Sequence, residues 1–309
     1  MYEYTEKIRY FINKPRKQHI LLKDVKYWNQ LCSSLDVIED SDLAIKAYLD
    51  RDFSQDDGGK YLRIYGLLQA MFLQQDAVEH LCESLGFSSD LTMYPKLKEI
   101  RDIRNDSVGH PTKRNKHKAY HFISRITIQK SGFQLVSYDK DGKLSFKDII
   151  VQDLVNEQKE CLSEILEKVI NILEKEEKEH KEKFKMEKIE TIFKHLPFYI
   201  SNVFEHIGES KPKQLGVMHI KIIKEKILDK FRNSLNDRGL EIDTYDSIKD
   251  IYELLEYPLS ELELFFDESK IEKEKIINHK TAYIFAFFIG KKLKKLEEIA
   301  KEMDDDYSN

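Results

Sequence analysis

Arg104, Asn105 and His110 stand close together in the sequence and could act together on a phosphate group. An arginine is permanently charged and offers a planar fork of donors to phosphate oxygens. A histidine can take up or release a proton near neutral pH, and an asparagine can hydrogen-bond a phosphate or orient an imidazole. The three residue types therefore indicate a candidate site for charge stabilisation and proton transfer at phosphorus.

Arg104 interrupts the apolar face of the helix that is predicted to carry it. With a step of about 100° per residue, it falls among the apolar side chains of one face, which are Leu97, Ile100, Ile103 and Val108. Three explanations fit this position: a buried ion pair with an acid such as Asp76, a side chain that reaches the edge of the core, or a place in an interface or active site.

Two helices and a stop signal position these residues. A helix is predicted from about Lys60 to Leu85, capped by the segment 56–59, and a second helix begins near Pro95. Gly109 and Pro111 end the second helix, because a proline disfavours helical geometry at the residue before it.

Residues 120–148 change to a period of two, which predicts a small antiparallel hairpin or three-stranded meander. The alternation runs from Phe122 to Ile128, a turn follows at Gly132, and a second turn lies at 139–142. We expect this sheet to be an insertion in a helical bundle.

The remaining chain has a helical pattern, so the predicted fold class is mostly α. The segment 174–183 has no apolar residue but several Glu-to-Lys pairs four residues apart, which keep a helix stable in water. The acidic stretch at 304–306 is interpreted as a tail. The predicted organisation is a helical domain with the β insertion, a charged helical linker and an all-helical C-terminal module: 1–173, 174–186 and 187–309.

Composition narrows the functional classes. The chain has 309 residues, a net charge of −5, 35% charged and 41% hydrophobic residues, which indicates a soluble helical protein and excludes a globally basic one. Neither a signal-like start nor a membrane-length apolar run is present, so we expect a cytoplasmic protein without membrane contact. The cysteines are predicted to be reduced core thiols: Cys32, Cys82 and Cys161.

Common cofactor motifs are absent from the sequence. It has no phosphate-loop glycine pattern, dinucleotide fingerprint or His-Glu-x-x-His pair, and we expect no cofactor and no metal. His117 and His121 are four apart but follow the helix stop, so a helical metal pair is not expected. The loop after Pro111 is basic and is either a solvated surface or a guide for a phosphate backbone, through Lys113, Arg114, Lys116 and Lys118.

The segment from Arg104 to His110 resembles the signature of the HEPN superfamily, whose members are helical-bundle proteins and in many cases metal-independent ribonucleases. That signature is an Arg, commonly followed by a polar residue such as Asn, and a His after four to six intervening positions. The resemblance covers roughly residues 17–173. A second match, Arg114 to His121, lies where the chain becomes a loop and then a strand, so helical context favours the first. Where some members carry a target Tyr for a partner nucleotidyltransferase, this chain has Thr112.

The resemblance implies a metal-independent endoribonuclease that acts as a toxin or in anti-phage defence by abortive infection. Arg104 would stabilise the phosphate, His110 would transfer a proton and Asn105 would assist. In a continuous α-helix His110 lies about 120° around and about 9 Å along from Arg104. The resemblance implies that two copies of the chain form a homodimer with a composite active site at their interface. The apolar face around Arg104 suits such an interface. RNA and an antitoxin or defence-system partner are the implied partners.

Two other interpretations remain open. One is a non-catalytic HEPN-type module that binds RNA or protein. The other is an unrelated helical interaction protein in which Arg104 makes a buried ion pair. In the ribonuclease interpretation, the C-terminal module would sense a trigger, bind an antitoxin or add to oligomerisation.

Overall fold

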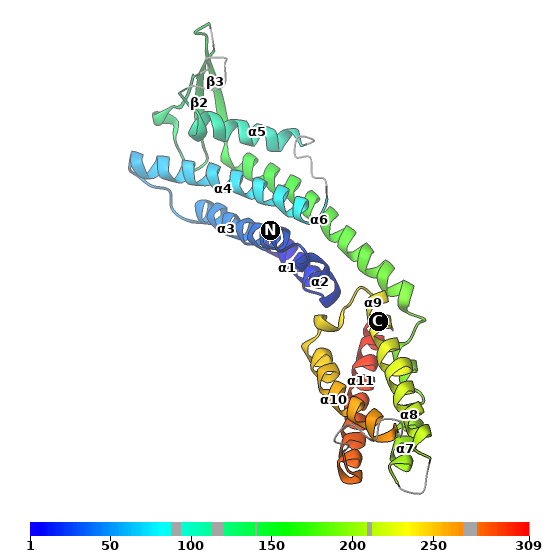
Figure 1. Ribbon diagram of the computed structural model, residues 1–309. Helices are drawn as coiled ribbons and strands as arrows, with labels where there is room; N and C mark the ends of the chain where they lie inside the picture. Colours follow the sequence, from blue (N-terminus) through cyan, green and yellow to red (C-terminus); the bar gives the residue numbers. More distant parts are fainter. Residues whose placement is uncertain (88–93, 113–119, 140, 209–211, 268–276, 309) are drawn as a thin grey trace. The chain divides into compact units, whose positions relative to one another are not determined.

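The computed structural model describes residues 1–87, 94–112, 120–139, 141–208, 212–267 and 277–308. The chain is mostly helical, with 78% helix, and its described part includes a small three-stranded antiparallel sheet (Figure 1). It divides into two compact units, Met1–Lys14 with Leu21–Lys175 and Pro15–Ile20 with Glu176–Asn309. No helix among the described residues is both long enough and apolar enough to span a membrane.

The helices of the first unit begin at residues that cap them. Asp56 accepts a hydrogen bond from the Gly59 amide at 2.8 Å, which confirms the cap predicted at 56–59. Asp24 accepts hydrogen bonds from the backbone amides of Lys26 and Tyr27. Pro95 occupies the first turn of its helix, where a missing amide hydrogen is harmless. The elements are α1 (Tyr2–Ile12), α2 (Pro15–Leu22), α3 (Val25–Asp50), α4 (Asp57–Ser84), α5 (Pro95–Arg104) and α6 (Val151–Phe184), the last of which continues into the second unit.

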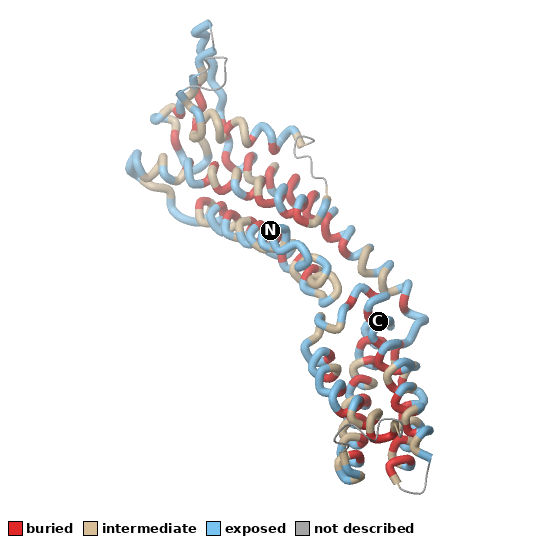
Figure 2. The backbone as a smooth tube through the Cα atoms, in the orientation of Figure 1, coloured by how far each residue is buried: buried red, intermediate tan, exposed pale blue. Residues whose placement is uncertain are grey.

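The core of the first unit lies between α3, α4 and α6, whose buried positions recur along each helix (Figure 2). A buried amide on α6 joins it to α4. Gln158 accepts a hydrogen bond from Gln75 at 2.8 Å and donates to the Met71 carbonyl and the Gln74 side chain at 3.1 and 2.9 Å. Because buried amides are costly when unpaired, these bonds fix the register of α6 against α4.

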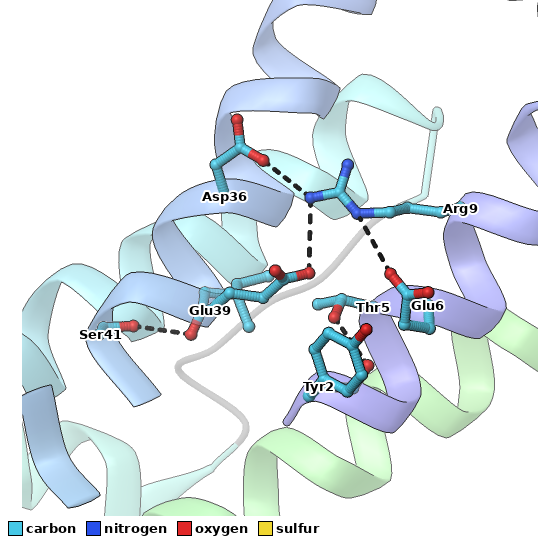
Figure 3. A network of polar contacts seen from close by, with 8 residues as sticks. Tyr2, Thr5, Glu6, Arg9, Asp36, Glu39 and Ser41 are labelled. Carbon is cyan, nitrogen blue, oxygen red and sulfur yellow. Dashed lines mark hydrogen bonds and ion pairs between the residues drawn. The ribbon is translucent and has the colours of Figure 1, made fainter. Parts of the chain in front are cut away.

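An exposed polar network joins α1 to α3 (Figure 3). Arg9 donates hydrogen bonds to Asp36 at 2.7 Å and Glu39 at 3.4 Å, and lies 3.8 Å from Glu6. Its side chain is partly exposed, so we assign it a small share of the stability beside the apolar core.

The sheet consists of β1 (Tyr120–Ile123), β2 (Gly132–Tyr138) and β3 (Leu144–Ile150), in the order β1-β2-β3. The prediction of a three-stranded meander is confirmed, but its first strand is shorter than expected. Arg125–Thr127 forms a 3₁₀ turn, because Thr127 donates from its amide and hydroxyl to the Ser124 carbonyl, at 3.0 and 2.7 Å. The same hydroxyl accepts the Gln134 amide at 2.9 Å, which closes the turn against β2.

The second unit is helical throughout its described residues. Asp304, interpreted from the sequence as part of an acidic tail, instead lies within the last helix and is buried at 6% exposure. Its carboxylate accepts the amides of Ile189 and Glu190 at 2.9 and 2.8 Å and so caps a 3₁₀ helix. The elements are η4 (Ile189–Phe193), α7 (Leu196–Ile207), α8 (Lys213–Ile222), η5 (Ile223–Asp229), α9 (Lys230–Asp237), η6 (Ile242–Thr244), α10 (Asp246–Phe266) and α11 (His279–Ser308).

Candidate active site

The predicted site lies on a π turn at the end of α5. Helix α5 continues directly into the π-helical turn η2, Asn105–Gly109, and the His110 amide closes it by donating to the Asn105 carbonyl at 2.7 Å. His110 then leaves the helix with φ −141° and ψ 50°, so the predicted stop at Gly109 and Pro111 is confirmed. Single π turns inside helices widen the backbone and often occur at functional sites.

Neutral side chains hold the guanidinium of Arg104. Its Nε and Nη2 donate to Gln69 Oε1 at 3.2 and 2.7 Å, and its Nη1 donates to Asn105 Oδ1 at 2.9 Å. The ring of Phe72 lies 4.2 Å from its Cζ. Among the described residues no carboxylate lies within ion-pair distance of Arg104. Its positive charge is therefore oriented but not neutralised, as an anion-binding group requires.

Of the three explanations left open for Arg104, the ion pair with Asp76 is wrong. Arg101 takes this acid instead, with Nη2 2.5 Å from Asp76 Oδ1 and Nε 2.8 Å from Gln75 Oε1. Helices α4 and α5 run in opposite directions, so a residue further along α5 meets an earlier residue of α4. Arg104 consequently reaches Gln69, where α4 offers an amide.

The apolar face of α5 belongs to the core of the first unit. Leu97, Ile100 and Ile103 are 0%, 1% and 3% exposed in a single copy of the chain. The interpretation of this face as a dimer surface is wrong for these three residues, because they are already covered by the chain itself. Arg104 lies half-buried at the edge of this face. The homodimer itself stays a prediction.

Gly109 lets the guanidinium lie along the π turn. A Cβ at this position would be 2.7 Å from Arg104 Nη1, closer than real Cβ atoms approach, and a tight 3.2 Å from Asn105 Oδ1. Arg104 thus extends to the residue directly before His110. The expected separation of about 120° assumed an unbroken α-helix, whereas the five-residue hydrogen bond places His110 one turn above Asn105.

His110 is exposed, and its imidazole makes no hydrogen bond or ion pair with any other residue that the structure describes. It can therefore meet a substrate without first breaking a contact. The predicted RNA-binding residues lie outside the described residues, as does His117: Lys113, Arg114, Lys116 and Lys118.

His121, the histidine of the second and disfavoured match to the signature, is a neighbour of the π turn. Its Nδ1 lies 2.7 Å from Ser137 Oγ, and its Nε2 lies 3.5 Å from Asp106 Oδ1 on the π turn. The pairing of β1 with β2 sets His121 opposite Ser137. The period-two pattern indicated the strands, but only the register brings these side chains together.

The cysteines are free thiols. Cys82 and Cys161 belong to the core, and burial raises the pKa of Cys161 above its ordinary value. In the part of the chain that the structure describes, no three His, Cys, Asp or Glu side chains gather closely enough to hold a metal ion.

Comparison of the chain with known protein families, curated proteins and solved structures finds no match. The functional interpretation therefore depends on the local signature and on the geometry of the π turn.

Proposed function

We propose that this protein is a metal-independent endoribonuclease of HEPN type. The observation that supports the proposal is the guanidinium of Arg104, which is oriented by amide oxygens and has no carboxylate partner among the residues described. It packs against Gly109, the residue directly before the exposed His110. A ribonuclease of this kind must stabilise charge on phosphate and move protons near neutral pH. Arg104 and His110 have these two properties.

The reaction that suits this site is transesterification within the RNA strand. The 2′-hydroxyl attacks the adjacent phosphorus, a base removes its proton, and the P–O5′ bond breaks as the 5′-oxygen gains a proton. The products are a 2′,3′-cyclic phosphate and a 5′-hydroxyl. Arg104 donates to the phosphoryl oxygens. Asn105 Oδ1 accepts from Arg104, which leaves its amide nitrogen as a further donor to phosphate.

The biological setting follows from the resemblance. We propose a cytoplasmic toxin or anti-phage defence nuclease that acts as a homodimer and is restrained by an antitoxin or another defence protein. Lys113, Arg114, Lys116 and Lys118 would contact the RNA backbone. If they do, replacing them weakens RNA binding and reduces its salt dependence.

The test is cleavage of a structured RNA in excess EDTA by the wild type and by Arg104→Ala and His110→Ala. Arg101→Ala is the matched control, since it removes an arginine of the same helix that pairs with Asp76. The proposal predicts cleavage by the wild type and the control, and at least about a hundred-fold loss in the other two variants. No cleavage by the wild type, or equal cleavage by all four proteins, would overturn it.

A non-catalytic RNA-binding module is the second candidate. Arg104 already packs on Phe72 and bonds Gln69, which also suits a structural role. RNA binding that persists in Arg104→Ala, without cleavage by any form of the protein, would favour this candidate.

A further inference from the structure

The predicted catalytic set contains one proton-transfer group where the reaction needs two. Transesterification requires a base for the 2′-hydroxyl and an acid for the 5′-oxygen. The side chains of arginine and asparagine do not transfer protons in proteins, which excludes Arg104 and Asn105 from both roles. His110 could serve one role only at a given step. A single copy of the chain therefore needs a second titratable group near η2.

His121 meets this requirement by its contacts. Its side chain is 11% exposed and held by Ser137, with Nδ1 2.7 Å from the hydroxyl oxygen. If Nδ1 donates this bond, Nε2 is the nitrogen left for a substrate. Nε2 lies 3.5 Å from Asp106, too far for a good hydrogen bond but close enough for the carboxylate to stabilise a charged ring.

A backbone hydrogen bond joins His121 to the residue that follows His110. The His121 amide donates to the Pro111 carbonyl at 2.7 Å, next in the chain to His110. Asp106, which faces the His121 ring, directly follows Asn105. His121 therefore contacts the π turn that follows Arg104 through its backbone at Pro111 and through its ring at Asp106.

We infer that His121 is the general acid of this site and that His110 is its base. This inference rests on the proposed ribonuclease function. The different contacts of the two imidazoles assign the roles. His121 has Asp106 beside it to stabilise the proton that it must give up. His110 has no carboxylate within ion-pair distance among the described residues. Both proton-transfer groups then come from one copy of the chain.

The charges that face His121 are few in the part of the chain described. η2 presents Asp106, and the facing strand β2 presents the hydroxyl of Ser137. A merely structural role is the competing explanation, in which this contact fastens β1 to η2. A test must therefore distinguish the loss of a proton donor from the loss of a structural contact between β1 and η2.

The test uses His121→Asn, because the asparagine amide nitrogen can take the place of Nδ1 and keep the hydrogen bond to Ser137. His110→Asn is the matched variant for the base, and His80→Asn, at an exposed histidine of α4, is the control. Cleavage in EDTA is followed against pH with ordinary RNA and with RNA whose bridging 5′-oxygen is sulfur, a leaving group that needs no proton.

We expect His121→Asn to cleave ordinary RNA about a hundred-fold more slowly than the wild type, and its pH profile to lose one limb. On the sulfur substrate it should recover most of the lost cleavage rate. His110→Asn should lose a similar factor and not recover. If His121→Asn keeps both limbs, or is not rescued by sulfur, the inference is wrong while the ribonuclease proposal stands. If the wild type cleaves neither substrate, the proposed function itself fails.

Discussion

The two π turns η2 in the first unit and η5 in the second share a backbone irregularity but differ in what surrounds it. In η5, Ile223 and Ile227 are 0% and 1% exposed. The Leu228 carbonyl accepts a hydrogen bond from Tyr252 at 2.6 Å, and Lys224 pairs with Glu263. Apolar packing and satisfied polar groups account for this turn as part of a core.

In η2 the polar groups are arranged but not neutralised. Arg104 is held by amide oxygens, and His110 is exposed beyond the end of the turn. A π turn alone therefore does not indicate a functional site. What distinguishes η2 is a charge with no opposite charge within ion-pair distance in the described residues, on a turn that ends at an exposed histidine.

Arg104→Lys should have the largest effect on RNA cleavage. An ammonium on a flexible stem cannot bond Gln69 and Asn105 at once while facing a phosphate. RNA cleavage should fall about a hundred-fold, with little change in the midpoint of thermal unfolding. Arg101→Lys, measured beside it, should keep its cleavage rate within about three-fold. Equal losses in the two variants would show that the guanidinium of Arg104 has no special role.

Gly109→Ala should have the next largest effect. The new methyl group would be 2.7 Å from Arg104 Nη1 and must displace it. We expect about a ten-fold loss of cleavage, corresponding to about 1.4 kcal/mol, in a protein that still folds. Gly66→Ala on α4 is the control, because its Cβ would meet no atom within 4 Å. An unchanged cleavage rate in Gly109→Ala would contradict the close packing of the guanidinium on the turn.

Tyr252→Phe probes the other turn. It removes the hydrogen bond to the Leu228 carbonyl and should lower the free energy of unfolding by about 1 kcal/mol. Cleavage measured well below the unfolding transition should not change. A loss of cleavage without a loss of stability would mean that η5 also takes part in function.

A pH dependence of stability is expected from a half-buried histidine of the second unit, His180. Burial, and then the charge of Arg16, lower the pKa of His180 from 6.5 to about 4. Between these values the unfolded chain binds a proton that the folded chain does not. Stability should therefore be complete above pH 6.5 and decline as the pH falls toward 4.

Chemical denaturation between pH 4 and 7 measures this dependence. His180→Gln should flatten part of it, whereas His195→Gln, at an exposed histidine, should leave it unchanged. A profile for His180→Gln that is identical to the wild type would contradict the assignment.

Local patterns in the sequence predicted the helices, the cap at Asp56, the helix stop at Gly109 and the small sheet. The π turn was not predictable, because its extra residue follows from tertiary packing and not from propensity. The partner of Arg104 was left open by the sequence for a related reason. Gln69 and Asp76 lie on the same helix, and only the direction of α5 decides which one an arginine meets. His121 required the strand register, which hydrophobic alternation leaves open.

The most direct test of the central claim is the chemistry of the products. In excess EDTA, wild-type protein should convert RNA to fragments that end in a 2′,3′-cyclic phosphate and begin with a 5′-hydroxyl, and Arg104→Ala should not. The same RNA with 2′-O-methyl groups should remain intact, because it has no nucleophile. Fragments with 5′-phosphate ends, or cleavage of the methylated RNA, would contradict 2′-hydroxyl attack at the Arg104 and His110 site.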